Sequence, residues 1–246
     1  GGTAANGQLE SGEIDFSTTY CTTFSIGLFV DIDTRLDPNG NGYGSYPYQM
    51  FVYNETLYFS AEDSTHGTEL WQTDGTVTGT SLVADINPGS VNSNPQYFTM
   101  LGDVMYFTAN EATTGIEIWT YDTNSPASTS NPARLADLYP GSNSPSISGF
   151  TEYQGSLYFA ADDSVYGKEL WKANPTTGLT MVKNIRPGSA GSDAYSLKVI
   201  GDIMYFRAND GTNGNEMWRS DGTTMGTYLS LIHISEPTRP RLMSYA

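Results

Sequence analysis

The chain has 246 residues, of which 38% are hydrophobic, and a formal net charge of −16. This length allows one large all-β domain or two ordinary ones, and the apolar fraction is ample for a packed core. The acidity disfavours nucleic acid and anionic membrane as partners, and no stretch approaches the roughly 18 apolar residues of a membrane helix.

The composition leaves little room for cysteine or histidine chemistry. Cys21 is the only cysteine, so an internal disulfide and a cysteine-rich zinc site are excluded. His66 and His233 are the only histidines, which leaves little material for histidine-based catalysis or metal binding.

Residues 1–28 are predicted to be a linker or the end of a preceding repeat unit. They begin Gly1-Gly2-Thr3 without a signal-peptide pattern, which indicates a fragment or a processed product. Phe29-Val30-Asp31-Ile32 is similar to residues 82–86, which close a later unit. The repeat region is therefore expected to begin with the last strand of an earlier unit.

Residues 29–229 are dominated by four copies of one pattern. Each copy has a Leu/Met-Tyr-Phe triplet, followed by a Glu and, two residues later, a Trp. The pairs are Glu69 and Trp71, Glu117 and Trp119, Glu169 and Trp171, and Glu216 and Trp218. Triplets and pairs both step by 48, 52 and 47 residues, and Pro-Gly-Ser recurs in step at 88–90, 140–142 and 187–189. Three landmarks that stay in phase indicate a true internal repeat.

The second copy shows what one unit contains. Gln96–Met100 is an aromatic-containing run that ends at the hairpin signal Gly102-Asp103. Val104–Ala109 is dense in β-formers, Glu117–Asp122 follows a loop, and Arg134–Leu138 closes the unit. Four short strands per unit predict an all-β fold of four-stranded β-propeller blades, stacked around a central channel.

The phase of the repeat is lost after Leu229. Another Asp is expected near position 232 and another Pro-Gly-Ser near 235–237, but the sequence runs LSLIHISEPTRPRLMSYA. This segment resembles translated sequencing-adapter read-through. Residues 230–246, with His233, Arg239 and Arg241, are therefore predicted to be non-native, and a true terminal cap is the alternative.

The recurring E-[LIM]-W-x-x-D-G-T pattern resembles the ELWxxDGT-repeat family of bacterial proteins. The full motif stands at Glu69–Thr76 and Glu216–Thr223, and it departs in the second copy (EIWTYDTN) and further in the third (ELWKANPT). The resemblance implies large, propeller-like, secreted or cell-surface proteins, mostly without an assigned activity. It supplies no catalytic residues, and it implies that this chain is an incomplete part of a larger propeller.

Residues that recur in every unit are predicted to stabilise the fold. Each Trp should wedge between neighbouring blades, and each Glu, on the same strand face, should accept hydrogen bonds from backbone amides of a neighbouring blade. Asp74 and Asp221 precede Gly-Thr in a turn, where an Asp caps its own backbone. Sugar stacking by the tryptophans and acid/base chemistry at the glutamates are the alternatives.

The ligand face is expected at one of the two rims of the repeat. Strand direction alternates, so the second-to-third loops (61–69, 109–117, 161–169 and 208–216) share a rim with the Pro-Gly-Ser connections, and analogy with other propellers favours this rim. The candidate ligand-face residues there are Asp63, His66, Glu111, Asp163, Tyr166, Lys168 and Asp210. Of these, His66, Tyr166 and Lys168 differ between units and are expected to give specificity.

Calcium is the one metal that these loops suggest. Oxygen-rich turns at Asp63, Asp163 and Asp210 have the ligand chemistry that calcium prefers. Their spacing matches neither an EF-hand loop nor a nonapeptide β-roll. Asx-type turns facing solvent are the alternative, and no cofactor is required by the sequence.

No catalytic constellation is visible in the sequence: the G-x-S-x-G, H-E-x-x-H and phosphate-loop motifs do not occur, and the sialidase box does not fit. The predicted function is a non-catalytic β-propeller module, extracellular or at the cell surface, that serves as a binding or display scaffold for a glycan or a protein. Further blades of the same full-length chain are expected neighbours. A carbohydrate-active hydrolase or lyase, which needs only two suitable carboxylates, and a calcium-stabilised structural array are the alternatives.

Overall fold

The computed structural model describes residues 30–125, 127–128, 130–174 and 177–230, which form sixteen β-strands. No helix in these ranges is long and apolar enough to cross a membrane. Cys21, His233, Arg239 and Arg241 lie outside the described residues, as do the predicted segment 1–28 and all of the predicted tail except Ser230. The boundaries at 29 and 229 therefore stay predictions.

Each repeat unit forms one four-stranded sheet. The first sheet contains β1 (Tyr48–Tyr53), β2 (Thr56–Asp63), β3 (Gly67–Thr73) and β4 (Ser81–Ala84). The second contains β5 (Gln96–Leu101), β6 (Val104–Glu111), β7 (Gly115–Asp122) and β8 (Ala133–Arg134). The third contains β9 (Ser148–Tyr153), β10 (Ser156–Asp162), β11 (Lys168–Asn174) and β12 (Gly178–Lys183). The fourth contains β13 (Tyr195–Ile200), β14 (Ile203–Asn209), β15 (Asn215–Ser220) and β16 (Tyr228–Leu229).

Within every sheet the strands pair in chain order and antiparallel, which confirms the predicted meander. The two central strands of each sheet are the most buried; in β6, five consecutive residues are buried, as a strand covered on both faces requires. The hairpin between β5 and β6 closes at Gly102, whose φ of 62° is a conformation that favours glycine.

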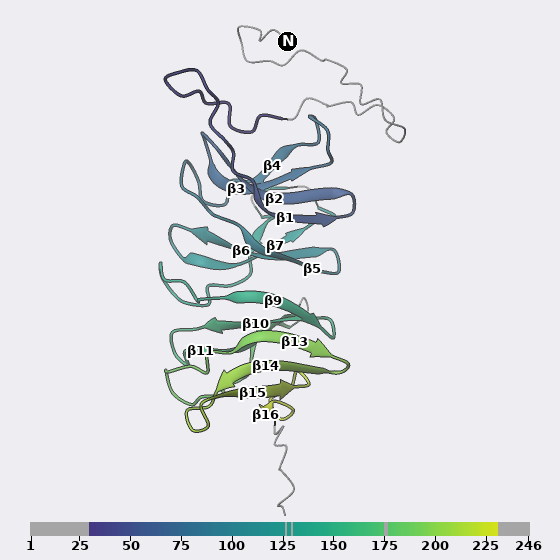
Figure 1. Ribbon diagram of the computed structural model, residues 1–246, viewed down its shortest axis with the longest axis vertical. Coiled ribbons are helices and arrows are strands. Elements are labelled where there is room, and N and C mark those ends of the chain that lie inside the picture. Colours follow the sequence, from purple (N-terminus) through teal and green to yellow (C-terminus); the bar gives the residue numbers. More distant parts are fainter. Residues whose placement is uncertain (1–29, 126, 129, 175–176, 231–246) are drawn as a thin grey trace, which may run out of the picture.

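The four sheets follow one another along the long axis of the molecule (Figure 1), and the first strands of consecutive sheets contact each other: β1 with β5, β5 with β9, and β9 with β13. The first and fourth sheets lie at opposite ends. The described chain is therefore an open row of sheets, in which each sheet packs on its neighbours.

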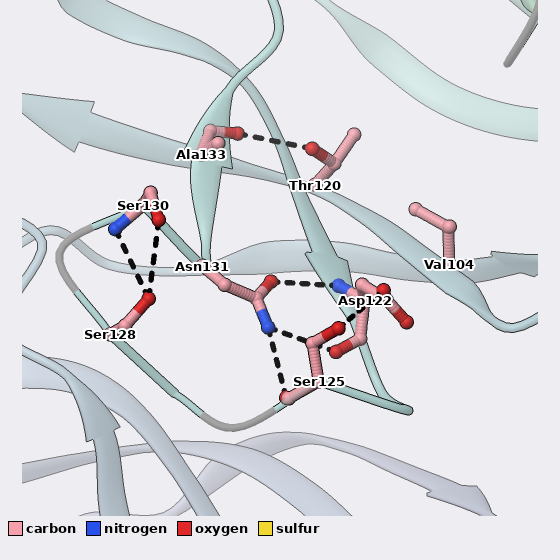
Figure 2. Close-up of a pocket in the computed structure, with 8 residues that line it drawn as sticks. All are labelled: Val104, Thr120, Asp122, Ser125, Ser128, Ser130, Asn131 and Ala133. Atoms are coloured by element: carbon pink, nitrogen blue, oxygen red, sulfur yellow. Dashed lines mark hydrogen bonds between the residues drawn. The ribbon is translucent and has the colours of Figure 1, made fainter.

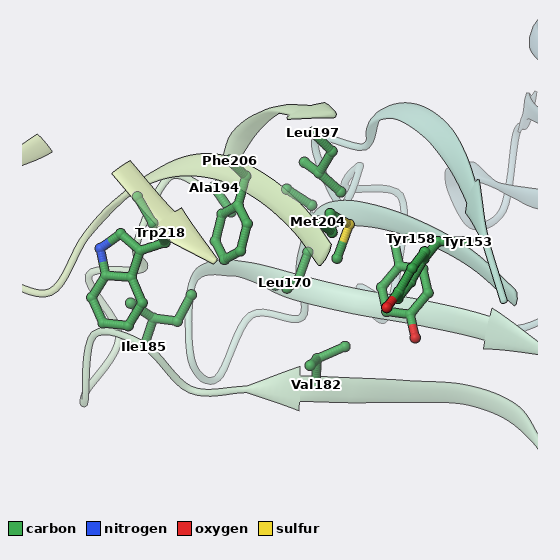
Figure 3. Close-up of a cluster of buried hydrophobic side chains, with 12 residues drawn as sticks. Tyr153, Tyr158, Leu170, Val182, Ile185, Ala194, Leu197, Met204, Phe206 and Trp218 are labelled. Carbon is green, nitrogen blue, oxygen red and sulfur yellow. The ribbon is translucent and has the colours of Figure 1, made fainter. Parts of the chain in front are cut away.

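The hydrophobic core lies between consecutive sheets. Between the third and fourth sheets, Leu170 and Val182 pack with Met204, Phe206 and Trp218 (Figure 3). Corresponding clusters fill the other two junctions. No sheet could bury both its faces alone, so stacking supplies the hydrophobic burial that stabilises the fold.

The recurring tryptophans lie where the wedge prediction expected them in three of the four units. Trp119, Trp171 and Trp218 pack at the junction with the preceding sheet. Trp71, in the first sheet, packs with Ile32 on the face turned away from the second sheet.

Two expected strands differ from the structure. The last strand of the second unit, expected at 134–138, is only Ala133–Arg134. The N–H of Leu135 still donates to the carbonyl of Ile118 in β7 at 2.8 Å, and the N–H of Leu138 donates to the side chain of Glu117. The strand expected at 29–32 is not formed by residues 30–32, which pair with no strand in the described chain.

Candidate functional site

The second-to-third loops and the connections between sheets share one rim, on the left in Figure 1. The backbone N–H of Thr68 donates to Asn92 Oδ1 at 2.9 Å, and that of Ser93 donates to the carbonyl of Thr68 at 3.0 Å. The third unit repeats this contact, with the N–H of Ser192 donating to the carbonyl of Lys168 at 2.9 Å. The predicted grouping of these segments is therefore present.

A glycine permits this close approach in each of the first three units. Gly67 has a φ of 70°, and a Cβ there would lie 2.6 Å from Asn92 Oδ1. At Gly115 and Gly167 a Cβ would meet backbone atoms of the connection at 2.5 Å. The glycine that stands four residues before each of these tryptophans is thus required by packing.

The recurring glutamate ties its sheet to the connection that leads to the next sheet. In the first unit, Glu69 is fully buried and accepts from the backbone N–H of Ile86 at 2.9 Å and of Ser93 at 3.1 Å, and from the Ser93 hydroxyl. Glu169, also fully buried, accepts from the backbone N–H of Ile185 and Arg186 and from the Ser192 hydroxyl. Glu117, fully buried as well, accepts from the backbone N–H of Leu138 and Tyr139. These carboxyl groups have the contacts of a structural brace and face no open site.

Burial changes the acidity of these braces. It raises the pKa of Glu69 and of Glu117 to about 7, although the hydrogen bonds they accept act in the opposite direction. The nearby carboxylates of Asp85 and Asp137 raise the two values further. Burial also raises the pKa of Glu169.

Glu216 differs from the other three members of the set. It is exposed, and the described residues provide no hydrogen-bond donors like those of Glu69. The connection that would follow its sheet, from position 231 onward, lies outside the described residues.

The Asp-Gly-Thr turns are closed by their own side chains. Asp74 Oδ1 accepts from the backbone N–H of Thr76 at 2.9 Å and from its hydroxyl at 2.7 Å, and the N–H of Gly79 donates to that same hydroxyl oxygen at 2.9 Å. A Cβ on Gly79 would lie 1.9 Å from Asp74 Oδ1. The turn at Asp221 repeats each of these contacts. These contacts within the turn account for the Asp, the first Thr and the second Gly of the recurring D-G-T-x-x-G-T spacing.

Asp63 and His66 form a local pair on the rim. Asp63 Oδ1 accepts from the backbone N–H of Thr65 at 2.8 Å and of His66 at 2.6 Å, and Asp63 Oδ2 lies 2.7 Å from His66 Nδ1. Burial acts to raise the pKa of Asp63, but the hydrogen bonds from His66 and Thr65 outweigh it and hold the pKa below its usual value.

Asp163 and Asp210 form the same kind of turn in the third and fourth sheets. Asp163 Oδ1 accepts from the N–H of Val165 and Tyr166, and Asp210 Oδ1 from the N–H of two residues of its own loop. The carboxylates thus cap their own backbones, as in Asx turns. Across the described residues, no three His, Cys, Asp or Glu side chains are grouped as a metal site.

The other rim residues also act within their own sheets. Glu111 accepts from Arg134 Nη1 at 2.8 Å, and the same nitrogen donates to the Thr114 hydroxyl at 2.6 Å. Tyr166 is exposed, and Lys168 is partly buried, which lowers its pKa even though neighbouring carboxylates act to raise it. The predicted residues share one rim but form no single cluster.

Three exposed tyrosines at or just before the first strands of their sheets are not predicted by the sequence pattern. Tyr46, Tyr97 and Tyr195 are 72%, 41% and 57% exposed beside this rim. Tyr97 has a φ of 61° at a bulge, and Gln49 occupies the same position in β1 with a φ of 53°. Gln49 Oε1 accepts from the N–H of Tyr97 at 3.3 Å, so the bulged residue bridges to the next sheet. An αL conformation at a non-glycine residue leaves no readable signal in sequence.

A hollow of about 550 Å³ lies beside the loop that joins β7 to β8 (Figure 2). Hydroxyl groups of Thr120 and three serines line it. Its one carboxylate, on Asp122, accepts from the N–H of Asn124 and the hydroxyl of Ser125. The hollow therefore offers polar surface without a free titratable group.

Comparison with known proteins gives the fold class. Neither a family model nor a curated protein matches the chain. Among solved structures, a prolyl endopeptidase is 13% identical with a TM-score of 0.52, over 85% of this chain and 29% of that one. TolB from Agrobacterium tumefaciens is 10% identical with a TM-score of 0.47, over 78% and 69% of the two chains. An α-L-arabinofuranosidase from Clostridium thermocellum is 15% identical with a TM-score of 0.33, over 75% and 70%.

At these identities the similarity concerns the fold alone. The fold is all-β and of the β-propeller type, with four four-stranded antiparallel sheets as its blades. This confirms the predicted fold class. The chain spans 29% of the length of the prolyl endopeptidase.

Proposed function

We propose that the chain is a non-catalytic binding or display module of the ELWxxDGT type, secreted or at a bacterial surface, whose loop rim binds a glycan or a protein. The observation that supports this proposal is that the recurring residues and the residues that vary between units lie in different places. The recurring Glu69 and Trp71 are engaged inside the fold, and the recurring Asp74 closes its own turn. The residues that differ between units, such as His66 and Tyr166, are left on the rim.

The carboxylates on the rim favour binding over catalysis. Asp63, Asp163 and Asp210 belong to different sheets, and each caps its own loop. A glycosidase needs two carboxylic acids that face one substrate across a fixed gap. Side chains that vary from loop to loop instead suit recognition, because loops carry specificity on a rigid scaffold.

The rim variant His66→Ala/Tyr166→Ala/Lys168→Ala tests this proposal against a panel of immobilised arabinan, xylan and galactan. We expect retention of at least one polysaccharide by the wild type and a loss of about tenfold or more in the variant, on the scale of a lost hot spot. The melting temperature should stay almost unchanged, because the three side chains are not part of the core.

The matched control is Val77→Ala/Met225→Ala, which removes two exposed apolar side chains from the turns that contain Asp74 and Asp221. It should bind like the wild type. A large fall in the melting temperature of the rim variant would contradict the assignment of the rim to binding. Release of new reducing ends from any of the polysaccharides would contradict the non-catalytic assignment.

A further inference from the structure

The connection that enters the first sheet contains an insertion that the later connections lack. β1 begins at Tyr48, which is 17 residues after Asp31. β5, β9 and β13 each begin 11 residues after the equivalent Asp or Asn, at positions 85, 137 and 184. The additional residues form a loop within 35–45, drawn in dark purple in Figure 1, where the later connections have Pro-Gly-Ser. We call residues 35–45 the inserted loop.

The base of the inserted loop is held against the loop rim. The backbone N–H of Glu62, at the end of β2, donates to the carbonyl of Ser45 at 2.8 Å, and Arg35 Nη2 donates to Glu62 Oε1 at 2.9 Å. Arg35 also pairs with the fully buried Asp33, so its positive charge is neutralised. The base is therefore fixed beside the first rim loop, while residues 38–42 at the tip are exposed.

The tip of the inserted loop has the residue spacing of a calcium-binding loop. It reads D-P-N-G-N-G-Y-G-S from position 37 to position 45. Calcium loops carry side-chain oxygens at positions 1, 3 and 5, a glycine at 6, a backbone carbonyl at 7, and at 9 a side chain that often acts through water. The residues at these six positions are Asp37, Asn39, Asn41, Gly42, Tyr43 and Ser45.

The structure brings the side chains of positions 1, 3 and 5 together. Asp37 Oδ1 accepts from the backbone N–H of Asn39 and of Asn41, both at 2.8 Å, and Asp37 Oδ2 accepts from Asn41 Nδ2 at 3.0 Å. Hydrogen bonds from the side chain and backbone of Asn41, and then from Asn39, hold the pKa of Asp37 below its usual value. The loop therefore presents an ionised carboxylate between two amides.

A half-turn of the Asn41 amide converts this arrangement into a set of oxygen ligands. It places Oδ1 where Nδ2 now stands, 3.0 Å from Asp37 Oδ2. Calcium–oxygen bonds of roughly 2.3–2.6 Å allow neighbouring ligand oxygens at about this separation. A cation can thus replace the amide hydrogens as the partner of the carboxylate.

Gly42 is explained by a calcium loop and not by packing. A Cβ on Gly42 would meet no atom within 4 Å, and its backbone is not in the left-handed region. Gly67 and Gly79, by contrast, are required by close contacts in their loops. In a calcium loop the glycine at position 6 permits the sharp turn around the ion. The rim loops at Asp63, Asp163 and Asp210 lack this spacing.

We propose that the inserted loop binds one calcium ion through the carboxylate of Asp37, the amide oxygens of Asn39 and Asn41 and the backbone carbonyl of Tyr43, with water completing the six to eight oxygens that calcium takes. The ion stiffens the tip of the loop beside Glu62 on the rim. The net charge of −16 favours accumulation of cations around the chain. This site is independent of whether the rim binds a glycan or a protein.

The affinity of this site is set by its small charge. The loop supplies one carboxylate, and position 12 is Tyr48 instead of the usual bidentate glutamate. Fewer charged ligands weaken calcium binding, so the expected Kd is roughly 0.1–1 mM, the range of extracellular calcium modules.

Titration of the ¹⁵N-labelled full chain with calcium chloride, followed by NMR, tests the proposal. Up to about 10 mM calcium, the amide signals of residues 37–45 should shift and saturate while the blades stay unchanged. Asp37→Asn keeps the shape and the acceptor oxygen but removes the charge, and it should raise the Kd about tenfold or more. The matched control is Asp74→Asn, because Asp74 also accepts from the N–H two residues later. It should change the Kd less than about twofold.

A gain of affinity gives an independent readout. Asn39→Asp introduces a second carboxylate at position 3 and should lower the Kd about fivefold or more, because affinity rises with the number of charged ligands. Magnesium should bind at least about fivefold more weakly than calcium, since it demands a tighter octahedral site and gives up its water reluctantly.

Four outcomes would overturn the proposal. They are no saturable shift in residues 37–45, an unchanged Kd in Asp37→Asn, an unchanged Kd in Asn39→Asp, and equal shifts with magnesium, which would indicate screening of the acidic surface. Saturable shifts centred on residues 61–69 instead would assign calcium to the rim loop at Asp63 and would also contradict the site in the inserted loop.

Discussion

At the scale of single residues, the same motif position has two environments. Glu69 is fully buried and accepts hydrogen bonds from Ile86 and Ser93, whereas Glu216 is exposed. A buried carboxyl group holds its proton to higher pH than one in the unfolded chain, since burial disfavours the charged form. Protonation of the recurring Glu is therefore coupled to folding only in units where this Glu is buried and accepts these hydrogen bonds.

This linkage predicts that stability falls as the pH rises. The pKa of Glu69 is about 7 in the folded protein against 4.5 in its unperturbed state, so its contribution is complete below pH 4.5 and is lost as the pH passes 7. Glu117 acts in the same direction. Urea unfolding between pH 4.5 and 8 should show a decreasing free energy of unfolding, with a smaller slope in Glu69→Gln.

The control for this prediction is Glu216→Gln, which should keep the slope of the wild type because Glu216 is exposed. An unchanged slope in Glu69→Gln would contradict the brace as the source of the pH dependence. Stability should also fall in acid, because Asp74 and Asp221, whose pKa values are lowered by hydrogen bonds from Thr76 and Thr223, lose those interactions below about pH 3.8.

At the scale of the strands, the third strand of each sheet contributes an indole to the core, at a junction with the preceding sheet in the second, third and fourth sheets. The Nε1–H groups of Trp71, Trp119, Trp171 and Trp218 are all buried and have no hydrogen-bond partner in the described chain. The tryptophans therefore contribute apolar area and shape, and their polar atom adds a desolvation cost.

Trp218→Ala should destabilise the protein by roughly 3–5 kcal/mol, the usual cost of removing a buried aromatic side chain. Trp218→Phe should cost clearly less, because it keeps a ring in the cluster with Phe206 and removes an unpaired donor. Thermal and urea unfolding of both variants measure the difference. If Trp218→Phe destabilised the protein as much as Trp218→Ala, the indole of Trp218 would have to make a polar contact that stabilises the folded protein.

At the scale of the whole molecule, the described chain is a row in which each sheet contacts only the sheets beside it. Stability in such an arrangement is approximately a sum of the sheets and their junctions. A junction can therefore loosen without loss of the others, and the sheet at the end of the row is held by one junction only.

Leu197→Ala should loosen the junction between the third and fourth sheets, where Leu197 is buried. Amide hydrogen exchange, followed by mass spectrometry, should become faster in β13 to β16 and stay unchanged in β1 to β8. A Leu→Ala change in a core costs roughly 2–5 kcal/mol, which is large enough to detect locally. Uniform acceleration along the chain would instead indicate a single cooperative unit.

The sequence by itself determined the strands, their order and the architecture. The spacing of Tyr-Phe, Glu-x-Trp and Pro-Gly-Ser is a local property of each unit, and strands, hairpins and Asp-Gly-Thr turns form from residues close in sequence. The clearest local misreading was the strand expected at 134–138. There only Ala133–Arg134 form a strand with β7, and the N–H of Leu138 donates to Glu117, 21 residues earlier.

Tertiary structure alone decided which of the repeated residues are engaged and which are left free. Glu69 is a brace because Ser93, 24 residues later, returns to it. Tyr97 became part of the rim through a bulge that no local pattern encodes. Sequence alternation assigns a side chain to one face of a strand, but only the packing of distant elements decides whether that face is buried.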